Sequence, residues 1–325
     1  MGILTNQNVA LQGYDMNAAF IFPGQGSQFV GMMKEFYGNR VVMDTIEEAS
    51  DTLRKDFSSL IFGDNEFELN QTTNTQPLIL ISSIAIWRLY REKNGPNPKI
   101  MAGHSLGEYS ALTAAEALDF KQALKLIEFR ANVMQKAVPT GIGTMAAVIG
   151  LSGEVVIEIC KKVSSLISKV EPANFNSADQ TVISGFCESV DEVCKIAKET
   201  GARRAIKLPV SAPFHSSLMS PASKELFIRL EQEKILPPKI PVVNNVDVDI
   251  LTNNNQIKDS LARQAMSPVR WYEIIRKFSN SEIDLLIECG PGKVLAGLNK
   301  RICPSIQSYS LSNELIINKV VSKNL

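Results

Sequence analysis

The stretch Ile100-Met101-Ala102-Gly103-His104-Ser105-Leu106-Gly107 decides how this sequence is interpreted. Three apolar residues precede a Gly-His-Ser-Leu-Gly pentapeptide, and helical periodicity continues over residues 108–118. Ser105 is therefore expected on a sharp turn between a strand and a helix, which is the context of a nucleophile elbow. A glycine on either side lets strand and helix approach closely around an exposed hydroxyl. The competing interpretation, which we favour less, is a serine that only caps the helix.

Composition excludes several classes of protein. The chain has 325 residues, 45% of them hydrophobic, which is enough for one large core or a large and a small one. Its 34 basic and 34 acidic residues cancel without a dense basic run, so no nucleic-acid partner is expected. The longest apolar run, residues 78–87, falls short of the roughly 18 residues of a membrane span, so no membrane association is predicted.

Cysteine and histidine usage points to a cytoplasmic protein without a metal. The five cysteines are odd in number and lack metal-ligand spacing, which is typical of reduced thiols. With only two histidines, a zinc site is disfavoured. Residues 1–15 lack the positive start and apolar centre of a secretory signal. We expect them to be a disordered leader, with Met16 as a candidate natural start.

Strand-like and helix-like segments alternate from Asn17 onward, which predicts an α/β fold with a mainly parallel sheet. Strands are expected at residues 18–22, before Pro23-Gly24-Gln25-Gly26, and at 283–288. Helices are expected at 41–60, at 77–92 with Pro77 in the first turn, at 120–137 and at 294–302. Together these segments predict a hydrolase-like catalytic domain made of residues 16–139 and 209–311, followed by a C-terminal tail at 312–325.

Residues 140–208 have a different rhythm. Strand-like and helix-like segments follow one another there in the order β-α-β-β-α-β, the ferredoxin-like pattern. This predicts a small domain inserted into the larger one. A ligand is expected in the cleft between the two, because domain interfaces are frequent binding sites.

A serine nucleophile needs a base, since an unperturbed hydroxyl is weakly nucleophilic. The chain offers only His104 and His215. The side chain of His104 should point away from that of its neighbour Ser105 in a tight turn, so a structural role is preferred for it. His215 is then the candidate base by elimination; a loop histidine without catalytic function is the alternative.

Acyl transfer also needs donors aimed at the oxyanion that develops. The backbone N–H of Leu106, next to the serine, is the first candidate. The second is the N–H of Gln25, whose flanking glycines permit close backbone approach. A phosphate loop at this position is disfavoured, because no Gly-Lys-Ser/Thr follows.

Arg130 lies at the edge of the apolar stripe of the helix at 120–137. A guanidinium turned toward a core needs an anion. Glu108 or Glu116 could supply it internally, the side chain could snorkel to the surface, or a substrate carboxylate could bind it bidentately. The residues alone leave these options open.

Several ordered motifs resemble malonyl-CoA:acyl-carrier-protein transacylases over nearly all of residues 16–311. They are Phe22-Pro23-Gly24-Gln25-Gly26-Ser27-Gln28, Thr75-Gln76-Pro77, Gly103-His104-Ser105-Leu106-Gly107-Glu108-Tyr109, Arg130, His215, Gln264 and Glu288-Cys289-Gly290-Pro291-Gly292-Lys293-Val294-Leu295. The resemblance implies a hydrolase-like large domain with a ferredoxin-like small one.

The resemblance also implies roles. Ser105 would form a malonyl ester with His215 moving the proton, and Arg130 would bind the free carboxylate. Gln25 and Leu106 would present the oxyanion donors, and Gln264 would lie in the segment that orients His215. Gln76 would support the site. The implied partners are malonyl-CoA, as substrate, and the phosphopantetheine thiol of an acyl carrier protein; no permanently bound cofactor is expected.

Two departures from the family pattern affect these expectations. Asn176-Ser177-Ala178-Asp179-Gln180 stands where relatives often have Ser-Pro-Gly, which concerns only a turn in the small domain. Phe214 stands where many stand-alone members have a small residue. In polyketide-synthase transacylases an aromatic there accompanies malonyl choice, so rejection of α-branched malonyl units is predicted.

Three alternatives stay open at this point. A discrete acyltransferase serving a polyketide synthase shares these motifs with an enzyme of fatty-acid synthesis. A serine hydrolase or thioesterase is disfavoured by Arg130 and by the missing acidic triad partner. A non-catalytic carrier-binding module would not need Ser105. We expect a monomer, with a basic carrier-docking face among Lys293, Lys300, Arg301, Arg203 and Arg204, unless these are only solvated surface charges.

Overall fold

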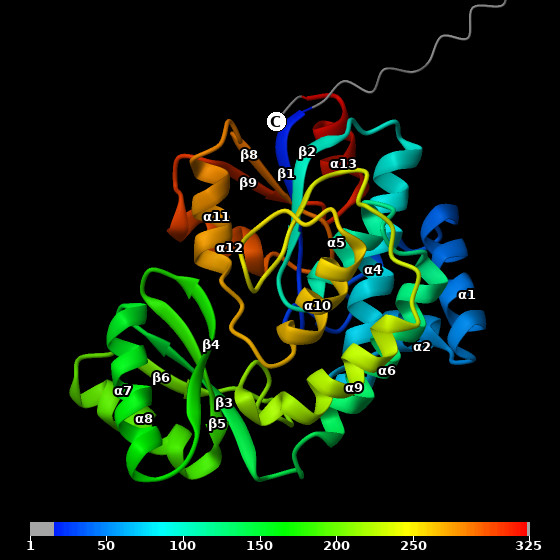
Figure 1. The fold of residues 1–325 in the computed structure, drawn as a ribbon. Helices are drawn as coiled ribbons and strands as arrows, with labels where there is room; N and C mark the ends of the chain where they lie inside the picture. Colours follow the sequence, from blue (N-terminus) through cyan, green and yellow to red (C-terminus); the bar gives the residue numbers. More distant parts are fainter. Residues whose placement is uncertain (1–15, 324–325) are drawn as a thin grey trace, which may run out of the picture.

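The computed structural model describes residues 16–323 (Figure 1). The predicted leader at 1–15 and the last two residues of the predicted tail lie outside this range. Within it, a large unit is built on a five-stranded sheet, and a small unit is built on a four-stranded one.

The large sheet has the strand order β7-β2-β1-β8-β9, and every neighbouring pair is parallel. Its strands are β1 (Met16–Phe22), β2 (Pro98–Gly103), β7 (Val242–Val243), β8 (Leu285–Glu288) and β9 (Gln307–Ser310). The central strand β1 has apolar residues at every position from 18 to 22, as expected for a parallel strand that is covered on both faces.

Helices cover both faces of the large sheet. Alternate residues of β1 point toward opposite faces and therefore pack into two different cores. Phe20 and Phe22 pack into the larger core, together with residues of α4, α5 and α6. Ile21 packs into a second core with residues of α11 and α12. The helices of the large unit are α1 (Arg40–Leu53), α2 (Phe57–Phe62), α3 (Glu66–Leu69), α4 (Thr72–Glu92), α5 (Gly107–Ala114), α6 (Phe120–Lys136), α9 (Ser220–Glu231), α10 (Asn254–Gln264), α11 (Trp271–Ser279), α12 (Val294–Ile302) and α13 (Glu314–Val321), with short 3-10 turns at Lys34–Phe36 and Ser217–Met219.

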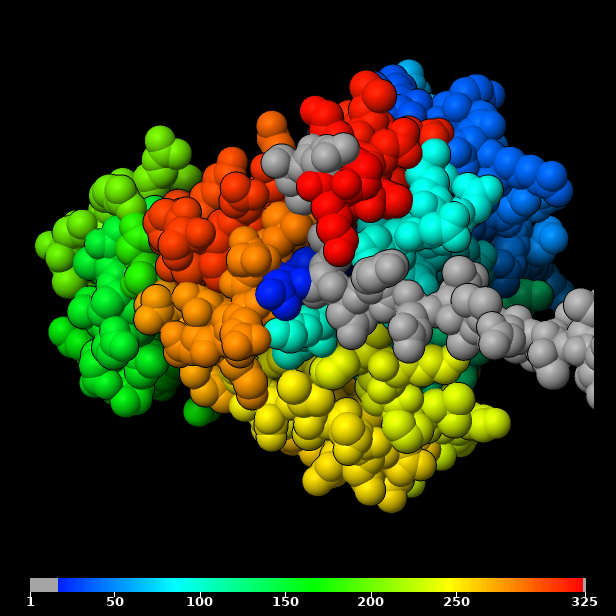
Figure 2. All heavy atoms as spheres, turned by 90° about the horizontal axis from the view of Figure 1, so that it is seen from above, coloured from blue at the N-terminus to red at the C-terminus, as the bar shows by residue number. Residues whose placement is uncertain are grey.

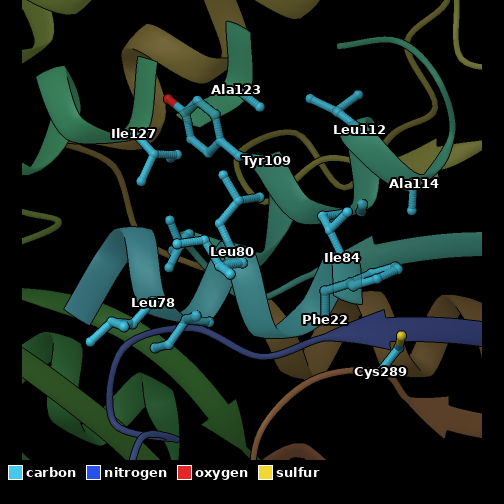
Figure 3. Packing of buried hydrophobic residues seen from close by; sticks show 14 of the residues in the cluster. Phe22, Leu78, Leu80, Ile84, Tyr109, Leu112, Ala114, Ala123, Ile127 and Cys289 are labelled. Carbon is cyan, nitrogen blue, oxygen red and sulfur yellow. The ribbon is translucent and has the colours of Figure 1, made fainter. Parts of the chain in front are cut away.

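Packing between α4, α5 and α6 fixes the helix that follows the Gly-His-Ser-Leu-Gly turn. In Figure 3 the ring of Tyr109, from α5, lies between Leu80 of α4 and the α6 residues Ala123 and Ile127. All four residues are completely buried. This helix therefore starts from a rigid core, which limits how far the preceding turn can move.

The small unit has β3 (Gly143–Ile149), α7 (Gly153–Leu166), β4 (Val170–Ser177), β5 (Gln180–Phe186), α8 (Cys187–Glu199) and β6 (Arg204–Lys207). Its sheet order is β4-β5-β3-β6 with antiparallel neighbours, so the predicted ferredoxin-like pattern and the α/β fold class are confirmed. Helices α7 and α8 pack on one face of the sheet. The boundaries at 139/140 and 208/209 enclose these elements and stay a prediction.

A backbone contact ties the small unit to the large one. Residue Val269, just before α11, makes a parallel bridge with Asn174 of β4. The N–H of Phe175 donates to the carbonyl of Val269 (2.9 Å), and the N–H of Val269 donates to that of Ala173 (2.9 Å). The face of the small sheet opposite α7 and α8 packs against the large unit through Met145, Ala173 and Val182. In Figure 1 the small unit lies at the lower left of the large one.

Three helix predictions need correction. The helix expected at 41–60 is two helices, because Arg54 adopts a left-handed conformation (φ 51°) after α1 and Asp56 caps α2. Helix α4 begins five residues before Pro77, because the N–H groups of residues 74 and 75 already bond to the carbonyl of Gln71. The helix after the serine ends at Ala114, before Glu116 turns left-handed (φ 59°).

Much of the segment predicted as a tail is helix α13, in which Ile317 and Val320 are completely buried in the larger core. Figure 2 shows this helix, in red, against the cyan and blue N-terminal half of the large unit, with the green small unit protruding on the other side. Within residues 16–323 no helix is both long and apolar enough to cross a bilayer.

Candidate active site

Ser105 lies on a left-handed turn (φ 52°) between β2 and α5, half-buried at the carboxyl end of the parallel sheet. Its flanking glycines are required by space. A Cβ on Gly103 would lie 1.8 Å from the carbonyl carbon of Gly107, and one on Gly107 would lie 2.0 Å from the carbonyl oxygen of Phe22. Both distances are far below any van der Waals contact, so larger residues would force the turn open.

The side chain of His215 contacts the hydroxyl of Ser105. Its Nε2 lies 2.7 Å from the Oγ of Ser105. Its Nδ1 lies 2.9 Å from the carbonyl oxygen of Gln264 and 3.2 Å from that of Ser267. Carbonyls only accept, so Nδ1 carries a proton and donates it, which leaves Nε2 of the neutral ring as the acceptor for the serine hydroxyl.

The environment of His215 keeps its ring neutral. Burial, followed by the nearby Arg130 cation, lowers the pKa of His215 to about 3, although the bonds to the Gln264 and Ser267 carbonyls oppose this. A neutral imidazole that already accepts the Ser105 proton is what nucleophile activation requires. The arrangement can therefore activate a serine without an acidic triad residue.

Arg130 is 1% exposed and points into the same site from α6. Its Nη1 donates to Oε1 of Gln76 (2.7 Å), and its Nη2 donates to Oε1 of Gln264 (3.0 Å) and to Oγ of Ser105 (3.2 Å). These three partners are neutral, and within the described chain no carboxylate lies within 4.0 Å of the guanidinium. Burial lowers the pKa of Arg130, although the nearby Tyr109 and Glu108 oppose this.

The internal carboxylates offered as partners for Arg130 do not pair with it. Glu116 is exposed and pairs with Lys239 on the surface. Glu108 is buried, but its Oε2 accepts from Nε2 of Gln264 (2.8 Å), so the amide stands between the two charges. Of the options left open by the sequence, an external anion fits this geometry best.

Two backbone N–H groups beside the cavity have no acceptor in the described chain. The N–H groups of Gln25 and Leu106 have no acceptor in the range 16–323, and both residues line the cavity next to Ser105. The side chain of Gln25 is held aside by a bond from its Nε2 to Oγ1 of Thr72 (3.3 Å). An oxyanion formed beside Ser105 could therefore receive two N–H groups.

The cavity has a volume of about 550 Å³ and lies between the two units. The large unit contributes Ser105, His215, Arg130, Gln76, Leu106 and Phe214, and the small unit contributes Met145, Asn174, Asn176, Gln180 and Val182. Phe214, directly before His215, is 6% exposed and forms part of the wall. The structure thus brings together every predicted site residue; Gln264 supports the site from behind.

Residues 19–311 match the family described as the acyl transferase domain. The chain belongs to this acyl transferase family. It is 45% identical over 304 residues to the malonyl CoA-acyl carrier protein transacylase of Haemophilus influenzae. The aligned region covers 93% of this chain and 97% of that protein. It is 43% identical over 311 residues to the protein of the same name from Bacillus subtilis, covering 94% and 98%.

Solved structures agree with this assignment. An acyl-carrier-protein S-malonyltransferase from Burkholderia pseudomallei is 48% identical, with a TM-score of 0.92 and coverage of 94% of this chain and 100% of that one. A malonyl-transacylase in complex with a type II PKS acyl-carrier protein is 44% identical, with a TM-score of 0.92 and coverage of 94% and 99%. The family resemblance predicted from the sequence is confirmed.

His104 of this acyltransferase points away from the Ser105 side chain. Its Nε2 lies 2.9 Å from Oδ1 of Asn176 in the small unit, and its ring lies 5.6 Å from that of Trp271. Burial lowers the pKa of His104. It therefore links the turn to the small unit, in line with the structural role expected for it.

Sequence reasoning missed two supports of the acyltransferase site, Asn245 and Ser267. Asn245 contacts the serine turn directly, since the N–H of Ser105 donates to its Oδ1 (2.7 Å). The available signal was an Asn-Asn pair directly after the apolar Val242-Val243, because polar residues at the carboxyl ends of parallel strands often line sites. In the described range, no cluster of three His, Cys, Asp or Glu residues could hold a metal.

Proposed function

We propose that this acyltransferase moves the malonyl group of malonyl-CoA to the phosphopantetheine thiol of an acyl carrier protein, through a malonyl ester on Ser105. The observation that carries the proposal is Arg130, a buried cation without a carboxylate partner, whose Nη2 lies 3.2 Å from the Ser105 hydroxyl. An acyl group with a free carboxylate at its far end would supply the missing anion while its thioester reaches the serine.

In the first half-reaction, Oγ of Ser105 attacks the thioester carbonyl while Nε2 of His215 takes the hydroxyl proton. The N–H groups of Gln25 and Leu106 stabilise the tetrahedral oxyanion. The C–S bond then breaks, and His215 returns the proton to the departing CoA sulfur. Arg130 and His215 both contact Oγ before reaction, so the carboxylate binds directly beside the hydroxyl that attacks.

In the second half-reaction, the carrier thiol gives its proton to His215 and its sulfur attacks the malonyl ester. The ester C–O bond breaks, and Oγ of Ser105 recovers the proton. The donor malonyl-CoA and the acceptor carrier thiol use the same cavity in turn, so the cycle is ping-pong. Gln264 supports both steps, since its carbonyl holds Nδ1 of His215 and its Oε1 holds Arg130.

Gln76 and Phe214 have further roles in the proposed reaction. Gln76 holds the other guanidinium nitrogen, and Phe214 narrows the cavity wall against α-branched malonyl units. A single methyl group in such a pocket is worth only about 1–3 kcal/mol.

We place the enzyme in fatty-acid synthesis, as a cytoplasmic monomer without a permanent cofactor. A polyketide carrier is the second candidate, because one relative is solved with a type II PKS acyl-carrier protein.

The test is incubation of the purified protein with malonyl-CoA, followed by intact mass measurement and peptide mapping. We expect a malonyl adduct on Ser105 that is absent in Ser105→Ala and is discharged by holo carrier protein. Absence of the adduct would refute transfer through Ser105, and release of free malonate without acylation of the carrier would refute transfer and favour a hydrolase.

A further inference from the structure

Asn245 makes two hydrogen bonds to the turn that carries Ser105. It follows β7 by two residues and is completely buried. Its Oδ1 accepts from the N–H of Ser105 (2.7 Å), and its Nδ2 donates to the carbonyl of Gly103 (2.6 Å). One carboxamide therefore spans the left-handed residue from both sides, across 140 positions of sequence.

The turn cannot supply these bonds itself. Ser105 precedes α5, so its N–H takes no part in the helix, and no backbone carbonyl of the described chain accepts it. Its φ of 52° belongs to a region that residues with a side chain occupy only under constraint from their surroundings. Without Asn245 the hydroxyl would rest on a turn with unpaired backbone groups.

Asn245 is itself fixed by groups that hold the rest of the site. Its N–H donates to Oε2 of Glu108 (2.9 Å), and its carbonyl accepts from the N–H of Arg270 (3.2 Å). The same Glu108 oxygen accepts from Nε2 of Gln264 (2.8 Å), which also donates to the Ser105 carbonyl (3.0 Å). The nucleophile turn and the support of His215 thus share one hydrogen-bonded network.

We propose that Asn245 is a positioning residue, which holds the Ser105 turn so that Oγ stays within reach of His215. This inference rests on the proposed function only in taking Ser105 as the nucleophile. The strand topology explains why Asn245 can do this. Since β7 is parallel to β2 with Val243 beside Ala102, the two chains leave the sheet together.

The test measures Ser105 reactivity separately from malonyl binding. We compare Asn245→Leu, which keeps the branched shape and the number of heavy atoms but removes both bonds, with wild type in the rate of sulfonylation of Ser105 by phenylmethanesulfonyl fluoride. In this reaction Oγ bonds to sulfur, fluoride leaves and His215 takes the proton. We expect a loss of about 100-fold, the size expected when a reacting group is misplaced by about 1 Å. With malonyl-CoA, kcat should fall while KM changes less than about threefold.

Asn244→Leu is the matched control, because Asn244 is buried in the same loop but bonds only within it, to the N–H of Asp247 and the carbonyl of Asp249. It should lower thermal stability and leave sulfonylation near the wild-type rate. If Asn245→Leu does not fold by circular dichroism, Asn245→Ala decides, with an expected loss of at least about tenfold, since water that fills the space positions the turn less well.

Three results would overturn the inference: a folded Asn245 variant that reacts at the wild-type rate, equal losses in Asn244→Leu, or a wild-type Ser105 that does not react with the sulfonyl fluoride. A wild type that is sulfonylated but forms no malonyl ester would instead refute the proposed function alone.

Discussion

At the scale of single residues, the electrostatics of Arg130 are what distinguish this site from a general serine hydrolase. A buried cation whose partners are amides and a hydroxyl lacks most of the compensation that a carboxylate would give. The glutamines keep the guanidinium in place without neutralising it. Both Gln76 and Gln264 are buried, so this arrangement is stable before the substrate arrives.

Replacement of Arg130 by alanine should therefore separate two acyl donors. We expect Arg130→Ala to reduce loading from malonyl-CoA by about 10- to 150-fold, the value of a hydrogen bond to a charged group, and to reduce loading from acetyl-CoA much less. The measurement is the rate of Ser105 acylation by each donor. Arg229→Ala, on the exterior of α9, should change neither rate, and equal losses for both donors would show that Arg130 does not bind the carboxylate.

The energetic argument for Asn245 also belongs to this scale. A residue other than glycine in the left-handed region costs about 1–3 kcal/mol. Two buried backbone groups left without partners cost about 1–3 kcal/mol each. The two bonds from Asn245 therefore outweigh the strain at Ser105, and their loss would favour a relaxed turn.

Site residues could be predicted from the sequence where a local pattern marks them. Ser105 stands in a motif, and His215 was one of two histidines, so both could be found without coordinates. The pKa of Glu108, which burial raises to about 7 while bonds from Gln264 and Asn245 oppose the rise, depends on residues more than 130 positions away. Such a network has no signature in a single sequence.

At the scale of elements, the carboxyl ends of the parallel strands hold the chemistry. The turn after β1 contributes Gln25, the turn after β2 contributes Ser105, and the chain after β7 contributes Asn245. Glu288, which ends β8, accepts from the N–H groups of Leu295 and Ala296 and so caps α12 rather than reaching the cavity. Helix capping therefore explains the presence of Glu288 in the motif at residues 288–295.

The tight packing of α5 against the end of β1 gives a prediction about stability. Gly107→Ala places a Cβ 2.0 Å from the Phe22 carbonyl oxygen, which is backbone and cannot move aside freely. We expect a loss of about 1–3 kcal/mol in the free energy of unfolding, measured by urea denaturation, together with slower sulfonylation of Ser105.

The matched control is Gly297→Ala. Gly297 lies inside α12, and an added Cβ there meets nothing within 4 Å. Because alanine is the better helix former by about 0.8–1 kcal/mol, this variant should be as stable as wild type or more so. A Gly107→Ala protein with unchanged stability would contradict the steric account of the turn.

Element boundaries were less predictable than element types. The break between α1 and α2 occurs at Arg54, where no glycine or proline marks it. Helix α13 was not predicted, because Ile317 and Val320 are buried only through their contacts with the core of the large unit, which the local sequence does not reveal. The two-residue strand β7 is too short for any periodicity, and this is why Asn245 went unnoticed.

At the scale of the whole molecule, the cavity exists only because two units face each other. The bridge between Asn174 and Val269, and the bond between His104 and Asn176, connect the small sheet directly to the chain around Ser105 and His215. The sequence predicted both folds from their element order. Their relative placement comes from these long-range contacts, which no local pattern encodes.

Charge at the cavity mouth is the feature of the whole molecule most relevant to the carrier protein. The formal net charge is zero, so overall charge cannot attract an acidic partner. Lys293 and Arg301 nevertheless line the cavity, are exposed, and make no ion pair within the described residues, whereas Arg203 is paired with Asp179. These two unpaired cations are the best-placed members of the predicted docking face.

Charge reversal at the mouth should therefore affect the second half-reaction. We expect Arg301→Glu to raise the KM for holo carrier protein by about fivefold or more, as for a rim charge worth about 1 kcal/mol, and the effect should shrink in 0.5 M salt because the site is exposed. Lys319→Glu, the same change on helix α13 away from the cavity, is the control and should leave this KM unchanged. Formation of the malonyl ester on Ser105 should be unchanged in both variants, since the ester forms inside the cavity. The docking surface would lie elsewhere if Arg301→Glu did not alter the KM for the carrier protein, or if both charge reversals altered it equally.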